Sequence, residues 1–276
     1  MITNQPGIEL VGIRLENPRG GSPLVNEANL RVTGGERALI VGAAGVGTSR
    51  LVAAVLGEAT PAEGHIEVLG HNVGKLRRSS LRLLRRRVGI VPQDLCLLED
   101  RSAQLNVVLP LEIDGIPRSL STVRAARVLA LLGLEAEAGV QVDQLSAAVR
   151  QRVAVARALV REPELVIADH PTSAQDAEGA ELVCAALSDA ARNGAACLVL
   201  GRDPQLRAIA ERDGWRQLGL VRARLSPLAQ LVTGGVALDE LLVDMSAPVG
   251  TGADGLPRDL PNVVPFPLAS RIAGAR

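Results

Sequence analysis

The chain has 276 residues, of which 47% are apolar, and its 30 lysines and arginines balance 30 aspartates and glutamates. This zero net charge argues against a dedicated nucleic-acid or anionic-membrane binder, although local basic patches are compatible with it. No run approaches about 18 apolar residues, and the N-terminus lacks the basic start and apolar core of a secretory signal. We therefore expect a cytoplasmic chain of one large or two modest domains.

Two features of the composition restrict the chemistry. The 3 cysteines lie far apart without metal-ligand spacing, so we expect buried thiols in a reducing compartment rather than disulfides. The only lysine is Lys75, and the only aromatic residues are Trp215 and Phe266. Any mechanism that needs a tyrosine, or a lysine elsewhere, is therefore excluded.

The N-terminal part has the element order of an α/β protein. Alternating apolar residues predict a strand at 8–15, and an apolar run predicts another at 36–41, which stops at a glycine cluster. Helical spacing follows at 49–56, and after a turn a third strand is predicted at 65–70. Strand, loop, helix and strand in this order indicate an α/β fold.

From residue 76 onward, helices and apolar strands alternate. A segment at 76–87 mixes leucines with six arginines and precedes a strand at 88–93. Buried strands that alternate with helices imply a mainly parallel sheet covered on both faces. The further predicted helices are 118–138, 146–161 and 177–193, and the further predicted strands are 163–169 and 195–200.

The character of the chain changes after residue 225. Leucines and a methionine recur at i, i+3, i+4 and i+7 within 236–245, with acidic residues opposite, which predicts a short amphipathic helix. We expect this helix to pack on its own domain. Beyond Pro248 the sequence is rich in proline and glycine, which favours an irregular tail.

The glycine cluster has part of the pattern of a phosphate-binding loop. Its glycines would let backbone N–H groups wrap phosphate oxygens, and Ser49 would supply a hydroxyl for magnesium. The lysine position holds Thr48. On its own, this segment fits an ordinary turn between strand and helix better than a phosphate site. The candidate nucleotide-binding residues are Gly42, Ala43, Ala44, Gly45, Val46, Gly47, Thr48, Ser49 and Arg50.

Four later motifs change that interpretation, because they follow the loop in the order of one family. VPQ at 91–93 resembles the glutamine loop, and LSAAV at 145–149 resembles the signature motif LSGGQ. PELVIADHPTSAQD at 163–176 resembles the Walker B strand with its D-loop, and GRD at 201–203 falls at the switch histidine. Over residues 8–222 the chain thus resembles the nucleotide-binding subunit of an ABC transporter.

The resemblance implies a fold and a division of the chain. The expected fold is an α/β P-loop NTPase core with a mainly parallel sheet, an N-terminal antiparallel β-subdomain and an inserted α-helical subdomain. Residues 1–225 would form this nucleotide-binding domain, with the helical subdomain at about 96–160, and 226–276 would form a C-terminal extension. Residues 106–117 further resemble the lipoprotein-releasing, macrolide-exporting and cell-division ATPases.

Several positions depart from the family pattern. Where family members have a lysine, a catalytic glutamate and a switch histidine, this chain has Thr48, His170 and Arg202. No aromatic residue lies near Asn17, where the family usually stacks one on adenine. We interpret His170 as a tolerated residue, with a replacement base as the alternative. The signature-like residues are Leu145, Ser146, Ala147, Ala148 and Val149, so both signature glycines are alanines.

The resemblance implies ATP and Mg²⁺ as cofactors, with Ser49, Gln93 and Asp169 as the magnesium neighbourhood. Loss of a charge-assisted hydrogen bond of about 1.5–3 kcal/mol weakens nucleotide binding by about one to two powers of ten. Arg50 lies about 200° around the helix axis from the lysine position, so it does not replace the lysine. Loss of the carboxylate removes on the order of 10²–10⁴-fold in rate. We therefore expect weak or absent ATP binding and assign no residue as catalytic.

These departures leave two functions open. The first is a catalytically impaired scaffold or regulator, peripheral on the cytoplasmic face of the membrane, that pairs with a membrane permease and a homologous ABC subunit in a homodimer or heterodimer. The second is an active component of a heterodimer, in which Ser146 completes a site shared with the homologous subunit. The motif order disfavours a stand-alone P-loop switch or kinase. We expect no nucleic-acid partner and interpret the arginines at 77–87 as a solvated face, with RNA or lipid head groups as alternatives.

Overall fold

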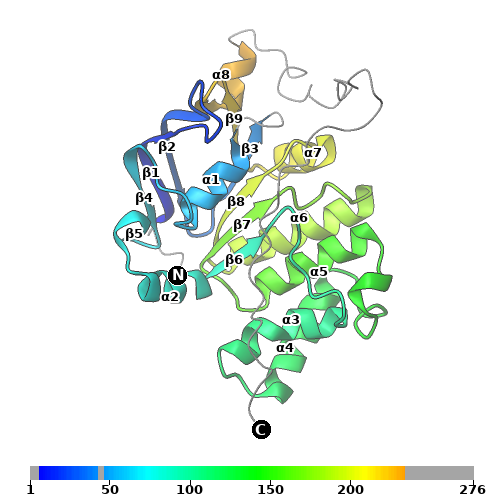
Figure 1. Ribbon diagram of the computed structural model, residues 1–276. Coiled ribbons are helices and arrows are strands. Elements are labelled where there is room, and N and C mark those ends of the chain that lie inside the picture. Colours follow the sequence, from blue (N-terminus) through cyan, green and yellow to red (C-terminus); the bar gives the residue numbers. More distant parts are fainter. Residues whose placement is uncertain (1–5, 43–46, 234–276) are drawn as a thin grey trace, which may run out of the picture. The chain divides into compact units, whose positions relative to one another are not determined.

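The computed structural model of the protein describes residues 6–42 and 47–233, which form two sheets flanked by helices (Figure 1). The smaller sheet is antiparallel and has the strand order β2-β1-β4-β5. Its strands are β1 (Pro6–Leu15), β2 (Val25–Thr33), β4 (Glu63–Val68) and β5 (His71–Asn72).

The larger sheet has the order β10-β9-β3-β8-β7-β6. All of its neighbouring strands are parallel except β9 and β10, which pair as an antiparallel hairpin. This architecture confirms the predicted fold class. The strands are β3 (Arg37–Gly42), β6 (Val88–Val91), β7 (Leu165–Asp169), β8 (Ala196–Leu200), β9 (Arg216–Val221) and β10 (Arg224–Pro227).

Helices connect the strands and cover the larger sheet (Figure 1). Two of them, α3 and α4, lie in the chain between β6 and α5, where the resemblance placed a helical insertion. The helices are α1 (Thr48–Val55), α2 (Arg78–Arg86), α3 (Ala103–Ile113), α4 (Arg118–Leu131), α5 (Ala147–Leu159), α6 (Ala177–Arg192), α7 (Pro204–Arg212) and α8 (Leu228–Thr233), with 3₁₀ turns η1 (Val73–Lys75) and η2 (Val142–Gln144).

Strand β3 separates two hydrophobic cores. Leu39 and Val41 belong to the core shared with the helices from α3 to α7. Ala38 and Ile40 point the other way, into the core formed with the antiparallel sheet and α1. Every residue of β7 and β8 is buried, as expected for parallel strands covered on both faces. The alternation of side chains therefore fixes which face each helix layer covers.

In β1, a glycine keeps the apolar residues on one face. Ile8 and Leu10 alternate inward, and the pairing with β2 shifts before Ile13, so that Ile13 and Leu15 are buried as well. Gly12 lies at this irregularity with a φ of 55°, a conformation that glycine adopts without strain.

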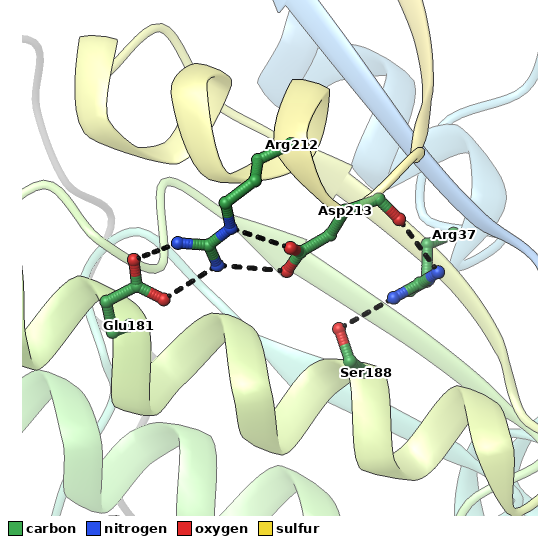
Figure 2. Close-up of polar contacts among 5 residues, drawn as sticks. All are labelled: Arg37, Glu181, Ser188, Arg212 and Asp213. Carbon is green, nitrogen blue, oxygen red and sulfur yellow. Dashed lines mark hydrogen bonds and ion pairs between the residues drawn. The ribbon is translucent and has the colours of Figure 1, made fainter.

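Ion pairs and hydrogen bonds tie α6, α7 and β3 together, as Figure 2 shows. Arg212 bridges Glu181 at 2.6 Å and Asp213 at 2.8 Å. Arg37 donates to the Ser188 hydroxyl at 3.0 Å and to the Asp213 carbonyl at 3.2 Å. The Arg37 guanidinium also lies 5.7 Å from the centre of the Trp215 ring, so the only tryptophan sits in a defined and buried environment.

The structure differs from the sequence predictions in several places. The helix predicted for 118–138 stops at Leu131, because Gly133 has a φ of 62° and the N–H groups of Gly133 and Leu134 close the helix end. Strands β2, β9 and β10 were not predicted. Cys96 is exposed, contrary to the expectation of three buried thiols.

The C-terminal predictions are only partly within the described residues. Helix α8 is described, but the amphipathic helix predicted at 236–245 and the tail beyond it lie outside the described part. The division into 1–225 and 226–276 stays a prediction. No helix in the two described ranges is long and apolar enough to cross a membrane.

Gly64 and Gly70 allow a controlled test of packing in the antiparallel sheet. Both have left-handed φ values, 75° and 76°, but a Cβ on Gly64 would lie 2.2 Å from the Val11 carbonyl oxygen, whereas nothing lies within 4 Å of one on Gly70. Gly64→Ala should lower the free energy of unfolding by about 2–5 kcal/mol, and Gly70→Ala by about 1–2 kcal/mol. Urea titrations followed by Trp215 fluorescence measure both, and equal losses would contradict the steric argument.

Candidate functional site

The candidate loop leaves the end of β3 and enters α1. Gly42 is the last residue of β3, Gly47 is the N-cap of α1 and Thr48 is the first helical residue. Gly47 has a φ of 108°, and a Cβ there would lie 2.7 Å from the Leu24 Cβ, so the position requires glycine. Residues 43–46 lie outside the described part, so the wrapping of a phosphate by this loop stays a prediction.

The positions after Gly47 differ in exposure. Thr48, at the lysine position, is only 9% exposed, so its short side chain forms part of the domain interior. Ser49 is exposed at the first turn of α1, and Arg50 is half-buried. The surface next to the loop therefore offers a hydroxyl from Ser49, while the position that would carry a cation is occupied by a buried threonine.

Asp169 ends β7 close to that hydroxyl. Its side chain is 5% exposed, and its Oδ1 has no hydrogen-bond partner among the described residues. Burial raises the pKa of Asp169, while the charge of His170 and a hydrogen bond from the Ser49 side chain lower it.

An unpartnered carboxylate oxygen beside a hydroxyl fits Mg²⁺, which prefers oxygen ligands. Ser49 and Asp169 are therefore the residues that would hold the ion. The described residues contain no cluster of three or more His, Cys, Asp or Glu side chains that suits a metal, so other ligands would have to complete the coordination. Gln93 is exposed and makes no described hydrogen bond to either residue.

His170 is fixed by its backbone. Its N–H donates to the Leu200 carbonyl at 2.7 Å, its carbonyl accepts from Gln151 Nε2 at 2.8 Å, and its φ is 53°. The imidazole Nε2 lies 3.8 Å from Asp169 Oδ1. Burial lowers the pKa of His170, the Asp169 charge raises it, and the Arg202 charge lowers it again. At neutral pH the position thus presents a neutral imidazole that faces Asp169, in place of a carboxylate.

Arg202 follows β8 and is near enough for its charge to lower the pKa of His170. It is half-buried, and its Nη1 has no hydrogen-bond partner within the described ranges. Asp203 beside it caps α7 by accepting from the Gln205 N–H at 2.9 Å. A guanidinium has no acceptor, so Arg202 has no means of taking a proton from water.

The signature-like residues form the start of α5. Ser146 is the exposed N-cap, and its hydroxyl accepts from the Val149 N–H at 3.3 Å. Leu145 is buried in the core shared with the helices. Ala147 and Ala148 are the first two helical residues. The unpaired N–H groups of a helix N-terminus are therefore retained here, although the glycines are not.

Gln151 forms a buried hydrogen-bond network that the sequence analysis missed. It is 4% exposed and donates to the His170 carbonyl and the Ser173 hydroxyl. Its Oε1 accepts from the Ala174 N–H at 3.1 Å and from Gln175 Nε2 at 3.0 Å. All four hydrogen-bonding positions of this amide are therefore filled.

The same network reaches the signature-like segment. Gln175 Nε2 also donates to the Ala148 carbonyl at 2.8 Å. The turn that contains Ser173, Ala174 and Gln175 is therefore fastened to the first turn of α5. Gln151 lies between Arg150 and Arg152 in α5, so nothing in the sequence indicated that this residue is buried.

Arg157, near the other end of α5, holds the loop that follows β6. Its guanidinium donates to the carbonyls of Leu95 and Cys96, both at 2.5 Å. Leu95 and Cys96 have positive φ values of 58° and 46°. Burial and the neighbouring Asp94 raise the pKa of the Cys96 thiol to about 11, so this exposed cysteine is protonated at neutral pH.

The predicted site residues thus fall into two groups. Ser49, Asp169, His170 and Arg202 lie together where β3, β7 and β8 end. The signature-like residues lie at the start of α5, where the Ala148 carbonyl is linked to that of His170 through Gln175 and Gln151.

Known proteins match the part of the chain that contains these motifs. The family described as ABC transporter matches residues 25–173. The methionine import ATP-binding protein MetN of Brucella abortus (strain 2308) is 36% identical over 212 residues, which cover 76% of this chain and 57% of that protein. MetN 2 of Burkholderia mallei is 32% identical over 265 residues, covering 89% of this chain and 67% of that protein.

Solved structures agree with the fold. The dimeric ATP-binding cassette MJ0796, in a post-hydrolysis state bound to ADP and Pi, has a TM-score of 0.72 and 26% identity, covering 80% of this chain and 98% of that one. The chain spans 57% of the length of the Brucella relative.

The Gln151 network generates a stability prediction. Gln151→Leu removes the four hydrogen bonds of this buried amide and should lower the free energy of unfolding by about 2–4 kcal/mol. Gln144→Leu is the control, because Gln144 is exposed and its side chain contacts only Gln141 at 3.5 Å. That variant should change stability by less than about 0.5 kcal/mol. Urea unfolding measures both, and wild-type stability of Gln151→Leu would show that the network contributes nothing.

Proposed function

The chain belongs to the ABC transporter family as an ATP-binding subunit, and from that premise we propose that its own nucleotide site is hydrolytically impaired and that it acts as a scaffold or regulator on a membrane permease. The family predicted from the motif order is confirmed. The narrower resemblance to the lipoprotein-releasing, macrolide-exporting and cell-division ATPases stays a prediction, because the relatives named above carry methionine-import names.

Thr48 is the observation that carries the proposal. A nucleotide-binding loop places a cation beside the β- and γ-phosphates, and here the first helical residue after Gly47 is a buried threonine. The only lysine of the chain is Lys75, far from the loop in sequence. The charge-assisted contacts that bind a triphosphate are therefore reduced to backbone N–H groups and the Ser49 hydroxyl.

The surroundings of Asp169 support impaired hydrolysis as well. The attacking water in this family needs a carboxylate at the position of His170, and the imidazole there faces Asp169 at 3.8 Å. The guanidinium of Arg202 has no acceptor for a water proton. Neither residue polarises the attacking water as the family's carboxylate does. We therefore expect this chain to retain weak ATP binding but to lose ATP hydrolysis.

Family members bind ATP and Mg²⁺, and we propose that this chain retains only weak binding of both. The ion, when bound, would neutralise phosphate charge. On the protein side, Ser49 and Asp169 would hold it, and Gln93, the third predicted ligand, is exposed just after β6.

The partners are proposed from the family and from the names of the relatives. A membrane permease and a second ABC subunit are the expected partners, and the related cassette MJ0796 is itself dimeric. Because the relatives are named for methionine import, a methionine importer is the first complex in which to test this chain.

Restoring the lysine tests the proposal directly. Thr48→Lys should tighten Mg-ATP binding by about 10- to 100-fold, because it returns a charge-assisted contact of roughly 1.5–3 kcal/mol. Titration calorimetry of the full chain with ATP and Mg²⁺ measures the change. Thr48→Gln is the control, since it adds length and polarity without charge.

A turnover assay decides the hydrolytic part. Wild-type protein should release phosphate from ATP no faster than Asp169→Asn does. Turnover at an ordinary ABC rate that disappears in Asp169→Asn would refute the proposal.

One observation favours the second candidate, an active heterodimer. Ser146 is exposed at the N-terminus of α5, beside the N–H groups of Ala147 and Ala148, which a helix leaves without intrahelical partners. Such an end is suited to the γ-phosphate of a nucleotide bound to another subunit. In that arrangement this chain completes a site without using its own loop.

Ser146→Arg separates the two candidates, because a bulky cation there would block a phosphate from the partner. If the chain completes a partner's site, the variant should lower the ATPase rate of the reconstituted two-subunit complex by at least about tenfold. If the chain is a scaffold only, the rate should stay unchanged. Ser119→Arg, on the exposed start of α4, is the matched control.

A further inference from the structure

The arginine-rich segment before β6 has no role in the site described above. Between Lys75 and Arg87 the chain has one lysine, six arginines and no acidic residue. In a chain with zero net charge this is a strong local asymmetry. The segment begins at the last residue of η1 and contains all of α2.

The last three arginines of this segment contact neighbouring parts of the fold. Arg85 donates to the Leu56 carbonyl at 3.0 and 2.7 Å and lies 3.4 Å from Glu58. Arg87 forms a two-pronged pair with Glu164 at 2.6 and 2.7 Å. Arg86 lies 3.6 Å from Asp114. These three charges are therefore balanced by neighbours.

The four cationic residues before Arg85 are not paired with carboxylates in this way. They are exposed, and within the described ranges they form no ion pair. Leu83 protrudes beside them with 63% of its surface exposed, although Leu84 next to it is 5% exposed. We call this group the α2 basic patch, and it consists of Lys75, Arg77, Arg78, Arg82 and Leu83.

Three residues of the patch, Arg78, Arg82 and Leu83, lie on α2, and Lys75 and Arg77 precede this helix. Arg78 and Arg82 are four residues apart, so they lie one above the other on the same side of the helix. Leu83 lies about 100° around the helix axis from Arg82, whereas Leu84 packs into the core with α1 and the antiparallel sheet. The exposed leucine therefore lies to one side of the two stacked arginines.

We propose that the α2 basic patch contacts the anionic phospholipid surface of a membrane. Unpaired arginines on an amphipathic helix attract negative lipid head groups, and a protruding leucine enters the head-group boundary. Single-stranded RNA suits the patch less well, because RNA binding draws on aromatic stacking. The only aromatic residues of the chain are Trp215, which is buried, and Phe266.

The expected affinity for lipid is too low for this contact to hold the chain on a membrane by itself. Each basic residue near an anionic surface strengthens binding about fivefold, so four of them together give several hundredfold. One basic cluster with one leucine gives marginal, reversible binding, and stable attachment needs a second contact. The proposed permease would supply it. The lipid contact itself does not require ATP chemistry, so it is tested apart from the proposed function.

Co-sedimentation of the full chain with vesicles tests the proposal. Vesicles of phosphatidylcholine with about one third phosphatidylglycerol should bind the chain, pure phosphatidylcholine should not, and about 0.5 M salt should abolish binding. Arg78→Gln/Arg82→Gln should weaken binding about 25-fold. The charge-matched control is Arg118→Gln/Arg127→Gln, two exposed arginines of α4, which should bind within about twofold of wild type. Leu83→Gln should weaken binding without changing its salt dependence.

Several results would overturn the proposal. These are no binding by the wild type, equal binding to neutral vesicles, or an equal loss in the α4 control. Tighter binding of a single-stranded RNA oligonucleotide, lost in Arg78→Gln/Arg82→Gln, would assign the patch to RNA instead. Trp215 fluorescence during urea unfolding verifies that each variant is folded.

Discussion

The register of three parallel strands is the constraint on which the rest of the structure depends. Ile40 of β3 pairs with Leu200 of β8, and Leu200 pairs with Asp169 of β7. Because the sheet is buried on both faces, a shift by one residue would exchange the side chains of the two cores. The loops after these strands must therefore emerge together. That is why Ser49 and Arg202 lie near Asp169 and His170, although they are far from them in the sequence.

The sequence predicted the parts of the fold that depend on pattern. Apolar runs at β7 and β8 and the order of motifs were sufficient for the α/β class and for the family. Strand β2 was missed because its inward residues do not alternate regularly: Val25 and Ala28 are three positions apart, across Glu27 with its positive φ of 51°. Strands β9 and β10 were missed because their apolar stretches are short. The Gln151 network was invisible, since it joins residues 19 to 24 positions apart through a tertiary contact.

The site shows which motif residues have structural roles of their own. Gly47 is required by its φ and by Leu24, and Ser146 caps a helix. These roles persist without any nucleotide, so the presence of these two residues is not in itself a sign of ATP chemistry. Thr48, His170 and Arg202 occupy positions whose family residues act on phosphate or water. The substitutions therefore affect the chemistry of the site while the framework around it is preserved.

Helix α5 connects two distant loops through one stiff element. Ser146 begins it and Arg157 holds the carbonyls of Leu95 and Cys96 near its other end, about 16 Å along the axis. Gln151 attaches the turn after β7 to the same helix. Hydrogen bonds thus attach α5 to a neighbouring loop near each of its ends. The loop after β6 and the turn beside Asp169 are therefore attached to one helix, through hydrogen bonds that involve no nucleotide.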